Sequence, residues 1–376
     1  MKISVPKESI QNEKRVALTP ESVKKLIAKG FEVSIETDAG KSANYRDNEY
    51  QEAGAKIVSS FSEAAASADI VIKVRHPNKD EINILKEGSI LLSFQDPINQ
   101  AQNLEGFKNK KITALALEFI PRSTLAQSMD VLSSMGTIAG YKSVLLAANA
   151  QQRLFPMMMT AAGTIPPVKM LILGAGVAGL QAIATAKKLG AVVEAFDTRP
   201  AVKQEVESLG AKFLEMELSE DAQDEQGYAK EMTEEFIKKE MELIEKHISK
   251  SDICISTAQV FGRKAPVLIK EYMVKKMKPG SVIIDLAAEQ GGNCELSKPG
   301  ETVNYNDVLI IGPENITSTM AEHTSKMISK NIENLLMHIV KENTINLESD
   351  DEIIQRPLLT KNGELVSQIV KDILNK

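Results

Sequence analysis

Residues 170–179 read Met-Leu-Ile-Leu-Gly-Ala-Gly-Val-Ala-Gly, and this stretch decides the fold. An apolar run typical of a buried strand, 170–173, meets a glycine-spaced turn, and a helix is expected over 180–189. In such a turn the first glycine permits the tight bend, the second lets a pyrophosphate approach the backbone, and the third lets the helix pack on the strand. The helix start offers amides and a partial positive charge to the phosphates. The predicted phosphate-binding residues are Gly174, Ala175, Gly176, Val177, Ala178 and Gly179.

The next predicted strand, 192–196, is followed by Asp197, Thr198 and Arg199. An acidic residue at this point accepts hydrogen bonds from the adenosine ribose and repels a 2′-phosphate, which predicts NAD(H) rather than NADP(H). Arg199 argues the other way, since an arginine there could pair with a phosphate.

Other strand ends should line the same cleft, because ligands bind at the carboxyl ends of parallel strands. Each of these positions is equally compatible with ordinary loop chemistry. The candidates are Thr257, Ala258, Gln259, Leu286 and Asn293.

Apolar runs alternate with helical patterns on both sides of this turn, which predicts parallel sheets covered on both faces. One helix should begin with Thr19 as N-cap and Pro20 in its first position and end at Gly30. Expected strands of the first pattern are 3–5, 33–35, 70–74, 90–94 and 112–117, and those of the second are 170–173, 192–196, 213–216, 253–256, 282–284 and 308–311.

Two long helices should link these patterns. Most of 126–154 is expected to be a helix that spans the domains, and a helix from Ser318 to about Val340 should cross back and return 343–376 to the first domain. The predicted fold is therefore α/β, with two Rossmann-like, doubly wound parallel-sheet domains joined by long helices and a discontinuous first domain. The expected domains are 1–128 plus 320–376, and 134–315 for NAD(H) binding.

Composition narrows the function. A net charge of −6 over 376 residues argues against a nucleic-acid partner. Two cysteines and four scattered histidines suggest neither a disulfide framework nor a metal site. No signal peptide and no apolar run near the roughly 18–20 residues of a membrane span is expected, which indicates a cytoplasmic type of chain. The acidic segment 217–235 is either a mobile functional loop or a solvated surface excursion.

Long runs of sequence carry a more specific signal than the fingerprint alone. These runs are AQSMDVLSSMGTIAGYKSVLLAA (126–148), FPMMMTAAGTIPP (155–167), GAGVAGLQAIATAKKLGAVVEAFDTRP (174–200), GYAKEM (227–232) and KMKPGSVIIDLAAEQGGNCELSKPGE (276–301). In them the chain resembles the NAD(H)-binding alpha subunits of proton-translocating NAD(P) transhydrogenases, in the split form whose membrane segments are on another polypeptide. More distantly it is similar to alanine dehydrogenase.

The resemblance implies a set of site residues outside the glycine-rich turn. A loop between the domains would orient the nicotinamide with Arg122, Gln127, Asp130 and Ser133, and Tyr228 would belong to a lid over the nucleotide. Taken by themselves, the loop residues are equally compatible with a cap on the connecting helix, and Arg122 could pair with Asp130.

The resemblance also implies partners and a place in the cell. It predicts a homodimer, NADP(H) on a beta subunit, a membrane-spanning component that couples hydride transfer to proton movement, and a position on the cytoplasmic side, peripheral to the inner membrane. The chain departs from the family at Leu125, at Arg263-Lys264 and at Thr317-Ser318-Thr319, which puts local contacts in doubt.

Alanine dehydrogenase is the alternative. Its family uses a Lys and a His as proton-handling residues, but the matching positions here hold Arg75 and Asp96, while Arg15 does match its carboxylate-binding arginine. Hydride exchange between two nicotinamides needs no general acid or base, so the sequence favours a transhydrogenase subunit. A non-catalytic NAD-sensing module is a third interpretation.

Overall fold

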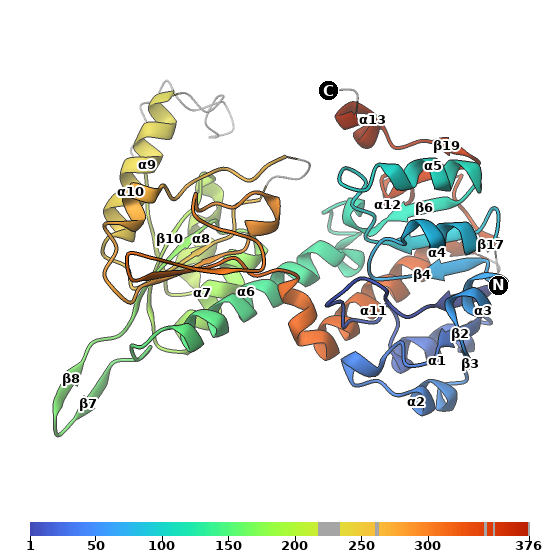
Figure 1. The fold of residues 1–376 in the computed structure, drawn as a ribbon, viewed down its shortest axis with the longest axis horizontal. Helices are drawn as coiled ribbons and strands as arrows, with labels where there is room; N and C mark the ends of the chain where they lie inside the picture. The colour runs from blue at the N-terminus through green and yellow to red at the C-terminus, as the bar shows by residue number, and fades with distance from the viewer. Residues whose placement is uncertain (217–233, 260–262, 342–343, 349, 375–376) are drawn as a thin grey trace. The chain divides into compact units, whose positions relative to one another are not determined.

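The computed structural model describes residues 1–216, 234–259, 263–341, 344–348 and 350–374. The chain forms two compact units: unit 1 contains Met1–Met135 and Thr317–Lys376, and unit 2 contains Gly136–Ile316. The C-terminal stretch of the ribbon thus belongs to the same unit as the N-terminal stretch (Figure 1). The first domain is discontinuous, as the sequence predicted.

Unit 1 is built on a sheet whose eight described strands follow the order β19-β18-β6-β5-β4-β1-β2-β3. All pairs from β3 to β6 are parallel, whereas β18 pairs antiparallel with β6 and with β19. The strands are β1 (Lys2–Val5), β2 (Glu32–Glu36), β3 (Lys56–Val58), β4 (Ile70–Ile72), β5 (Ile90–Ser93), β6 (Thr113–Ala116), β18 (Leu358–Lys361) and β19 (Glu364–Leu365).

Helices cover both faces of this sheet, and α11 is the longest of those described in unit 1. Its buried residues Ile328, Ile332, Leu335 and Ile339 recur at helical spacing and pack in the same core cluster as Ile72. The helices are α1 (Pro20–Ala28), α2 (Asp47–Glu52), α3 (Phe61–Ala65), α4 (Lys79–Ile84), α5 (Gln102–Asn109), α11 (Ala321–Ile339), α12 (Glu352–Gln355) and α13 (Gln368–Leu374), and a small hairpin pairs β16 (Val340–Lys341) with β17 (Thr344–Ile345).

Thr19 occupies the N-cap position of α1, as expected, but its side chain makes no capping hydrogen bond. Its backbone N–H donates to Ser329 Oγ at 2.9 Å, and the Thr19 and Ser329 hydroxyls lie 3.3 Å apart. Tertiary packing against α11 has therefore replaced the local cap.

Unit 2 contains a second sheet, with the order β11-β10-β9-β12-β13-β15-β14 among the described strands. Taken in chain order, its six parallel strands follow the sequence 3-2-1-4-5-6 of a doubly wound dinucleotide fold. The strands are β9 (Lys169–Leu173), β10 (Val192–Phe196), β11 (Lys212–Phe213), β12 (Ile253–Ser256), β13 (Val282–Asp285), β14 (Thr302–Tyr305) and β15 (Val308–Ile311).

Alternate residues of β9 enter two different cores. Ile172 packs in one cluster with Ala182 and Ile183 of α7 (Val177–Lys188), whereas Leu173 packs in another with Ile244 of α9 (Glu234–Ile248). Both faces of the strand are thus buried, which explains its uninterrupted apolar sequence. The remaining described α-helices of unit 2 are α8 (Lys203–Ser208) and α10 (Glu271–Val274).

Two strand predictions in unit 2 were incomplete. The strand expected at 213–216 ends at Phe213, and the antiparallel edge strand β14 was missed. β14 alternates exposed and half-buried residues and turns into β15 through Asn306 and Asp307, which both have positive φ. Two such residues form a tight hairpin turn, so the missed signal was in the turn rather than in the strand.

Helix α6 (Val131–Ala150) runs from the end of unit 1 into unit 2. In unit 2 it crosses the start of α7 closely, because a Cβ on Gly140 would lie 2.1 Å from the Ala178 carbonyl oxygen. Among the described residues, α6 is the helix long and apolar enough to cross a membrane by length and composition alone. The expectation that no such segment exists was wrong by this measure, although a core helix meets the same criterion.

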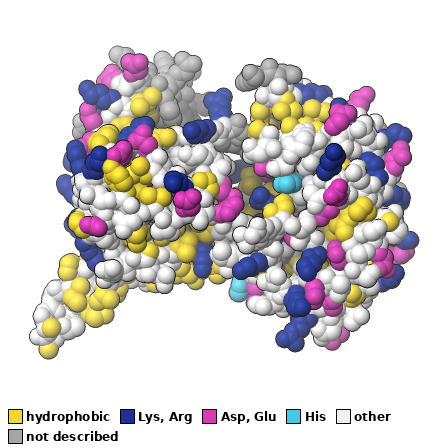
Figure 2. Space-filling model, in the orientation of Figure 1, with side chains coloured by type: hydrophobic (Ala, Val, Ile, Leu, Met, Phe, Trp, Pro, Cys, Tyr) yellow, Lys and Arg dark blue, Asp and Glu magenta, His cyan; other side chains and the backbone are white. Residues whose placement is uncertain are grey.

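A hairpin of β7 (Met158–Thr160) and β8 (Gly163–Ile165) projects from the rest of unit 2 (Figure 1). Its two strands pair only with each other in the described structure. Met157, Met159 and Ile165 are exposed, and Met159 is 78% exposed, so the arm shows a hydrophobic surface (Figure 2).

Candidate functional site

The glycine-rich turn connects β9 to α7 at the carboxyl edge of the unit 2 sheet. Gly174 has a φ of +96°, and a Cβ there would lie 2.5 Å from Thr257 Oγ1. A Cβ on Gly179 would lie 1.9 Å from the Gly174 carbonyl oxygen. The turn itself therefore requires both glycines.

Gly176 has a different role. Its φ of −75° suits any residue, and the nearest atom to a Cβ at this position is Arg199 Nη2, 4.0 Å away. The fold does not need a glycine here, yet the absent side chain leaves the backbone open at the start of α7. The first amides of a helix have no acceptor within the helix. Such a cradle fits a pyrophosphate.

Asp197 follows β10 directly, and its side chain is only 7% exposed. Its carboxylate accepts the Ala175 N–H at 2.7 Å and the Arg199 N–H at 2.9 Å. The Arg199 guanidinium adds two bonds of 2.9 Å, from Nε to Oδ1 and from Nη2 to Oδ2. Burial acts to raise the pKa of Asp197, but the hydrogen bonds from Arg199 and Ala175 outweigh it and hold the pKa below its usual value. The carboxylate is therefore ionised at neutral pH.

The predicted residues at the other strand ends are joined to this turn and to one another. Thr257 Oγ1 donates to the Gly174 carbonyl oxygen at 3.1 Å, and Gln259 Nε2 donates to the Leu286 carbonyl oxygen at 2.7 Å. Asn293 is fully buried and bonds both backbone groups of Ala258. The structure thus gathers these side chains at one edge, where Asn293 positions the loop after β12.

The sequence analysis did not single out Gly140 of α6. Its close approach to Ala178 fixes a helix directly behind the glycine-rich turn. Gly136 lies one turn earlier on the same helix, and a Cβ there would meet Val177 Cβ at 3.5 Å. The spacing of these two glycines was the available signal for close helix packing.

The predicted nicotinamide-orienting residues belong to unit 1 and lie between residues 122 and 133. Arg122 and Gln127 are exposed, and within the described structure no ion pair joins Arg122 to Asp130. Instead, Asp130 accepts hydrogen bonds from the backbone N–H of Ser133 at 2.9 Å and from its hydroxyl at 2.5 Å. Asp130 thereby caps the first turn of α6, whatever further role it has.

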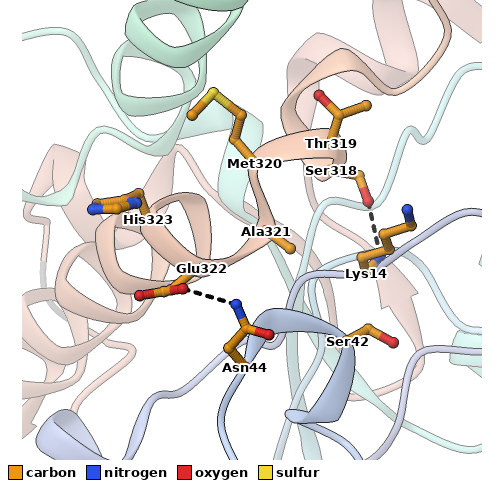
Figure 3. A pocket seen from close by; sticks show the side chains of 9 residues that line it. All are labelled: Lys14, Ser42, Asn44, Ser318, Thr319, Met320, Ala321, Glu322 and His323. Carbon is orange, nitrogen blue, oxygen red and sulfur yellow. Dashed lines mark hydrogen bonds between the residues drawn. The ribbon is translucent and has the colours of Figure 1, made fainter.

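A hollow of about 270 Å³ opens in unit 1 at the start of α11 (Figure 3). Across it the Lys14 backbone N–H donates to Ser318 Oγ at 2.8 Å, and Asn44 Nδ2 donates to Glu322 Oε2 at 2.9 Å. None of the predicted site residues lines this hollow.

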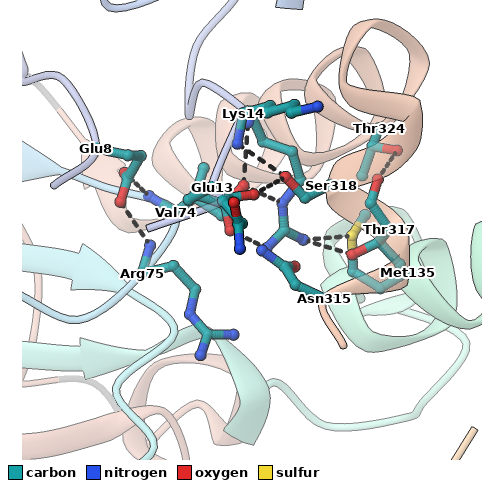
Figure 4. Close-up of polar contacts among 12 residues, drawn as sticks. Glu8, Glu13, Lys14, Val74, Arg75, Met135, Asn315, Thr317, Ser318 and Thr324 are labelled. Atoms are coloured by element: carbon teal, nitrogen blue, oxygen red, sulfur yellow. Dashed lines mark hydrogen bonds and ion pairs between the residues drawn. The ribbon is translucent and has the colours of Figure 1, made fainter. Parts of the chain in front are cut away.

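Beside it lies the region that alanine dehydrogenase would use for its substrate (Figure 4). Arg15 is 3% exposed, and Glu13 accepts its Nε at 2.7 Å and its Nη2 at 2.5 Å. Glu8 accepts the backbone N–H groups of Val74 and Arg75, and burial raises the pKa of Glu8 to about 7. Asp96, which stands at the histidine position, accepts Asn99 Nδ2 at 2.9 Å.

The predicted lid, with Tyr228, lies outside the described residues.

Comparison with known proteins gives a consistent result over both units. Models of the N-terminal and C-terminal domains of the alanine dehydrogenase/PNT family match residues 4–139 and 143–368. The first segment of the split NAD(P) transhydrogenase subunit alpha of Rhodospirillum rubrum is 48% identical to this chain over 375 residues, which are 97% of this chain and 98% of the relative.

Two solved structures are similar over nearly the whole chain. A transhydrogenase from Sinorhizobium meliloti is 40% identical with a TM-score of 0.86, covering 98% of this chain and 100% of that one. An L-alanine dehydrogenase is 28% identical with a TM-score of 0.84, covering 100% and 99%.

Proposed function

Because this chain belongs to the alanine dehydrogenase/PNT family, we propose that it is the NAD(H)-binding subunit of an NAD(P) transhydrogenase. Hydride then passes directly between NADH bound to this chain and NADP⁺ held by a partner subunit. The observation that supports this most is the open backbone at Gly176, beside the buried carboxylate of Asp197.

In this proposal the turn from Gly174 to Gly179 holds the pyrophosphate on the amides of α7. Asp197 accepts the ribose hydroxyls, and Thr198, which is exposed next to it, faces the adenosine end. Thr257 and Gln259 line the path towards the nicotinamide, and Asn293 keeps their loop in place.

Arg122, Gln127, Asp130 and Ser133 are proposed to orient the nicotinamide, with Tyr228 as a lid residue. Hydride exchange between two nicotinamides moves no proton at the reacting carbons, so these residues need only hold the ring and exclude water. The bonds from Ser133 fix the Asp130 carboxylate, which leaves the exposed Arg122 and Gln127 as the side chains able to adjust.

Partners complete the proposed activity. A beta subunit would supply NADP(H), and a membrane-spanning component would couple hydride transfer to proton translocation. This chain would then lie on the cytoplasmic side of the inner membrane and be attached through these subunits.

The second proposed partner is another copy of this chain. An isolated two-stranded hairpin is marginally stable in water, and exposed apolar surface on an arm is typical of an interface. Residues 154–168, which include the β7–β8 arm, carry no charge, so the same apolar surface can pair with itself about a two-fold axis.

Titration calorimetry of NADH tests the nucleotide site. Wild type should bind NADH, whereas Gly176→Ala should keep its unfolding temperature and lose about tenfold or more in affinity, because the new methyl group fills the phosphate cradle. Absence of NADH binding by the folded wild type would refute the proposal.

A second assay separates the proposed function from that of alanine dehydrogenase, whose matching Arg15 is the feature that favours it. The chain alone should not oxidise NADH with pyruvate and ammonia, since Arg75 and Asp96 replace the proton-handling residues. Adding an NADP(H)-binding subunit should start hydride exchange. Oxidation with pyruvate would favour the alternative.

A further inference from the structure

The Asp197–Arg199 pair occupies the place where the adenosine ribose is expected. Asp197 Oδ1 accepts the N–H and Nε of Arg199, and Oδ2 accepts Nη2 of Arg199 and the N–H of Ala175. A carboxylate offers about four lone-pair sites, and these four donors use them all. Ribose hydroxyls can therefore bond Asp197 only if a donor leaves.

The guanidinium is the donor able to leave. Its side chain is 43% exposed, whereas the Asp197 side chain is 7% exposed. The two backbone N–H groups are fixed by the turn and by the chain that follows β10. Arg199 also lies over the phosphate cradle, since Nη2 is 4.0 Å from the Cβ position of Gly176.

We infer that the Asp197–Arg199 pair, and not Asp197 alone, sets the choice between NAD(H) and NADP(H). This inference rests on the proposed nucleotide site. In the wild type, Asp197 repels a 2′-phosphate and also holds the one guanidinium that could bind it. Without the charge on Asp197, the same guanidinium is placed to take a 2′-phosphate in bidentate fashion.

Four variants test this assignment by calorimetry with NADH and with NADPH. They are Asp197→Asn, Arg199→Gln, the double variant of both, and Asp197→Asn with Lys203→Gln. Asparagine keeps the size of the side chain and one acceptor for the Ala175 N–H. Lys203 is the matched control because it is a nearby cation that pairs with Glu215 instead of Asp197.

Asp197→Asn should bind NADPH about tenfold more tightly than wild type does. Adding Arg199→Gln should abolish that gain, whereas adding Lys203→Gln should preserve it. Arg199→Gln alone should bind NADPH no better than wild type, because Asp197 still repels the phosphate, and it should retain NADH binding. Circular dichroism confirms that each variant is folded.

A double variant that binds NADPH as tightly as Asp197→Asn would overturn the inference, since repulsion by Asp197 would then explain everything. Failure of Asp197→Asn to gain NADPH affinity would overturn it as well. Neither result touches the proposed function, which depends on whether wild type binds NADH at all.

Discussion

Gly179 lies against the Gly174 carbonyl oxygen so closely that a methyl group on Gly179 would be 1.9 Å from that oxygen. The first turn of α7 is thus held directly on the end of β9. The adjacent Gly176 has open space at its Cβ position. Two glycines of one motif are therefore separable by experiment, since one is needed for packing and the other for the ligand.

Gly179→Ala should lower the free energy of unfolding by about 1–3 kcal/mol, because the added methyl group cannot fit without moving helix or strand. Urea denaturation measures this. Gly176→Ala is the matched control and should stay within about 0.5 kcal/mol of wild type, as surface substitutions do. Equal stabilities for the two variants would contradict the distinction.

The glycines of α6 give a second matched pair. Gly140→Ala places a Cβ 2.1 Å from the Ala178 carbonyl oxygen, whereas Gly136→Ala meets Val177 at an ordinary 3.5 Å. We expect Gly140→Ala to displace α7 and weaken NADH binding about tenfold, although Gly140 is outside the predicted site. Gly136→Ala should stabilise the helix by up to about 1 kcal/mol and bind NADH normally. Calorimetry and thermal unfolding distinguish them, and normal NADH binding by Gly140→Ala would count against this role.

The strands that the sequence predicted best are those buried on both faces. The bounds predicted for β10, β12 and β15 match the structure, because complete burial requires an unbroken apolar run. The strands that it missed lie at sheet edges, where one face meets water. β18 and β19 are joined through Asn362 and Gly363, both at positive φ, so that dipeptide was the readable signal.

The site was predictable as a set of residues but not as a set of contacts. The fingerprint placed Asp197 and Arg199 beside the turn, yet their pairing depends on how the arginine side chain folds back. For Asp130 the sequence left a ligand role and a helix cap equally open. The structure shows the cap, which a single aspartate before a helix cannot distinguish from a binding role.

The β7–β8 arm predicts an assembly phenotype. Met159→Lys should shift the chain from dimer towards monomer in size-exclusion chromatography with light scattering, since a charge on the arm would be buried against its copy. Leu374→Lys is the control, because Leu374 is another exposed apolar residue but lies in unit 1. A wild type that is monomeric at all concentrations, or a Met159→Lys variant that stays dimeric, would remove the arm from the interface.

Glu240 predicts a pH dependence of stability in unit 2. It is 5% exposed and lies on the buried face of α9, one turn from Phe236 and one turn from Ile244. Burial raises its pKa from 4.5 to about 7. Between these values the folded chain holds a proton that the unfolded chain has lost. The contribution of Glu240 to stability therefore falls as the pH rises from about 4.5 to 7 and stays low above that.

Glu240→Gln removes this titration and keeps the size of the side chain. Relative to wild type, the variant should be more stable by about 1–2 kcal/mol at pH 8 and nearly equal at pH 4.5, because only the ionised form is penalised by burial. Burial raises the pKa of Glu8 and Glu118 to about 7 as well, so the readout is the difference between variant and wild type. Glu242→Gln, on the exposed side of α9, is the control. Urea titrations at the two pH values measure the effect, and a stability difference that does not change with pH would show that the Glu240 carboxyl titrates as an exposed one does.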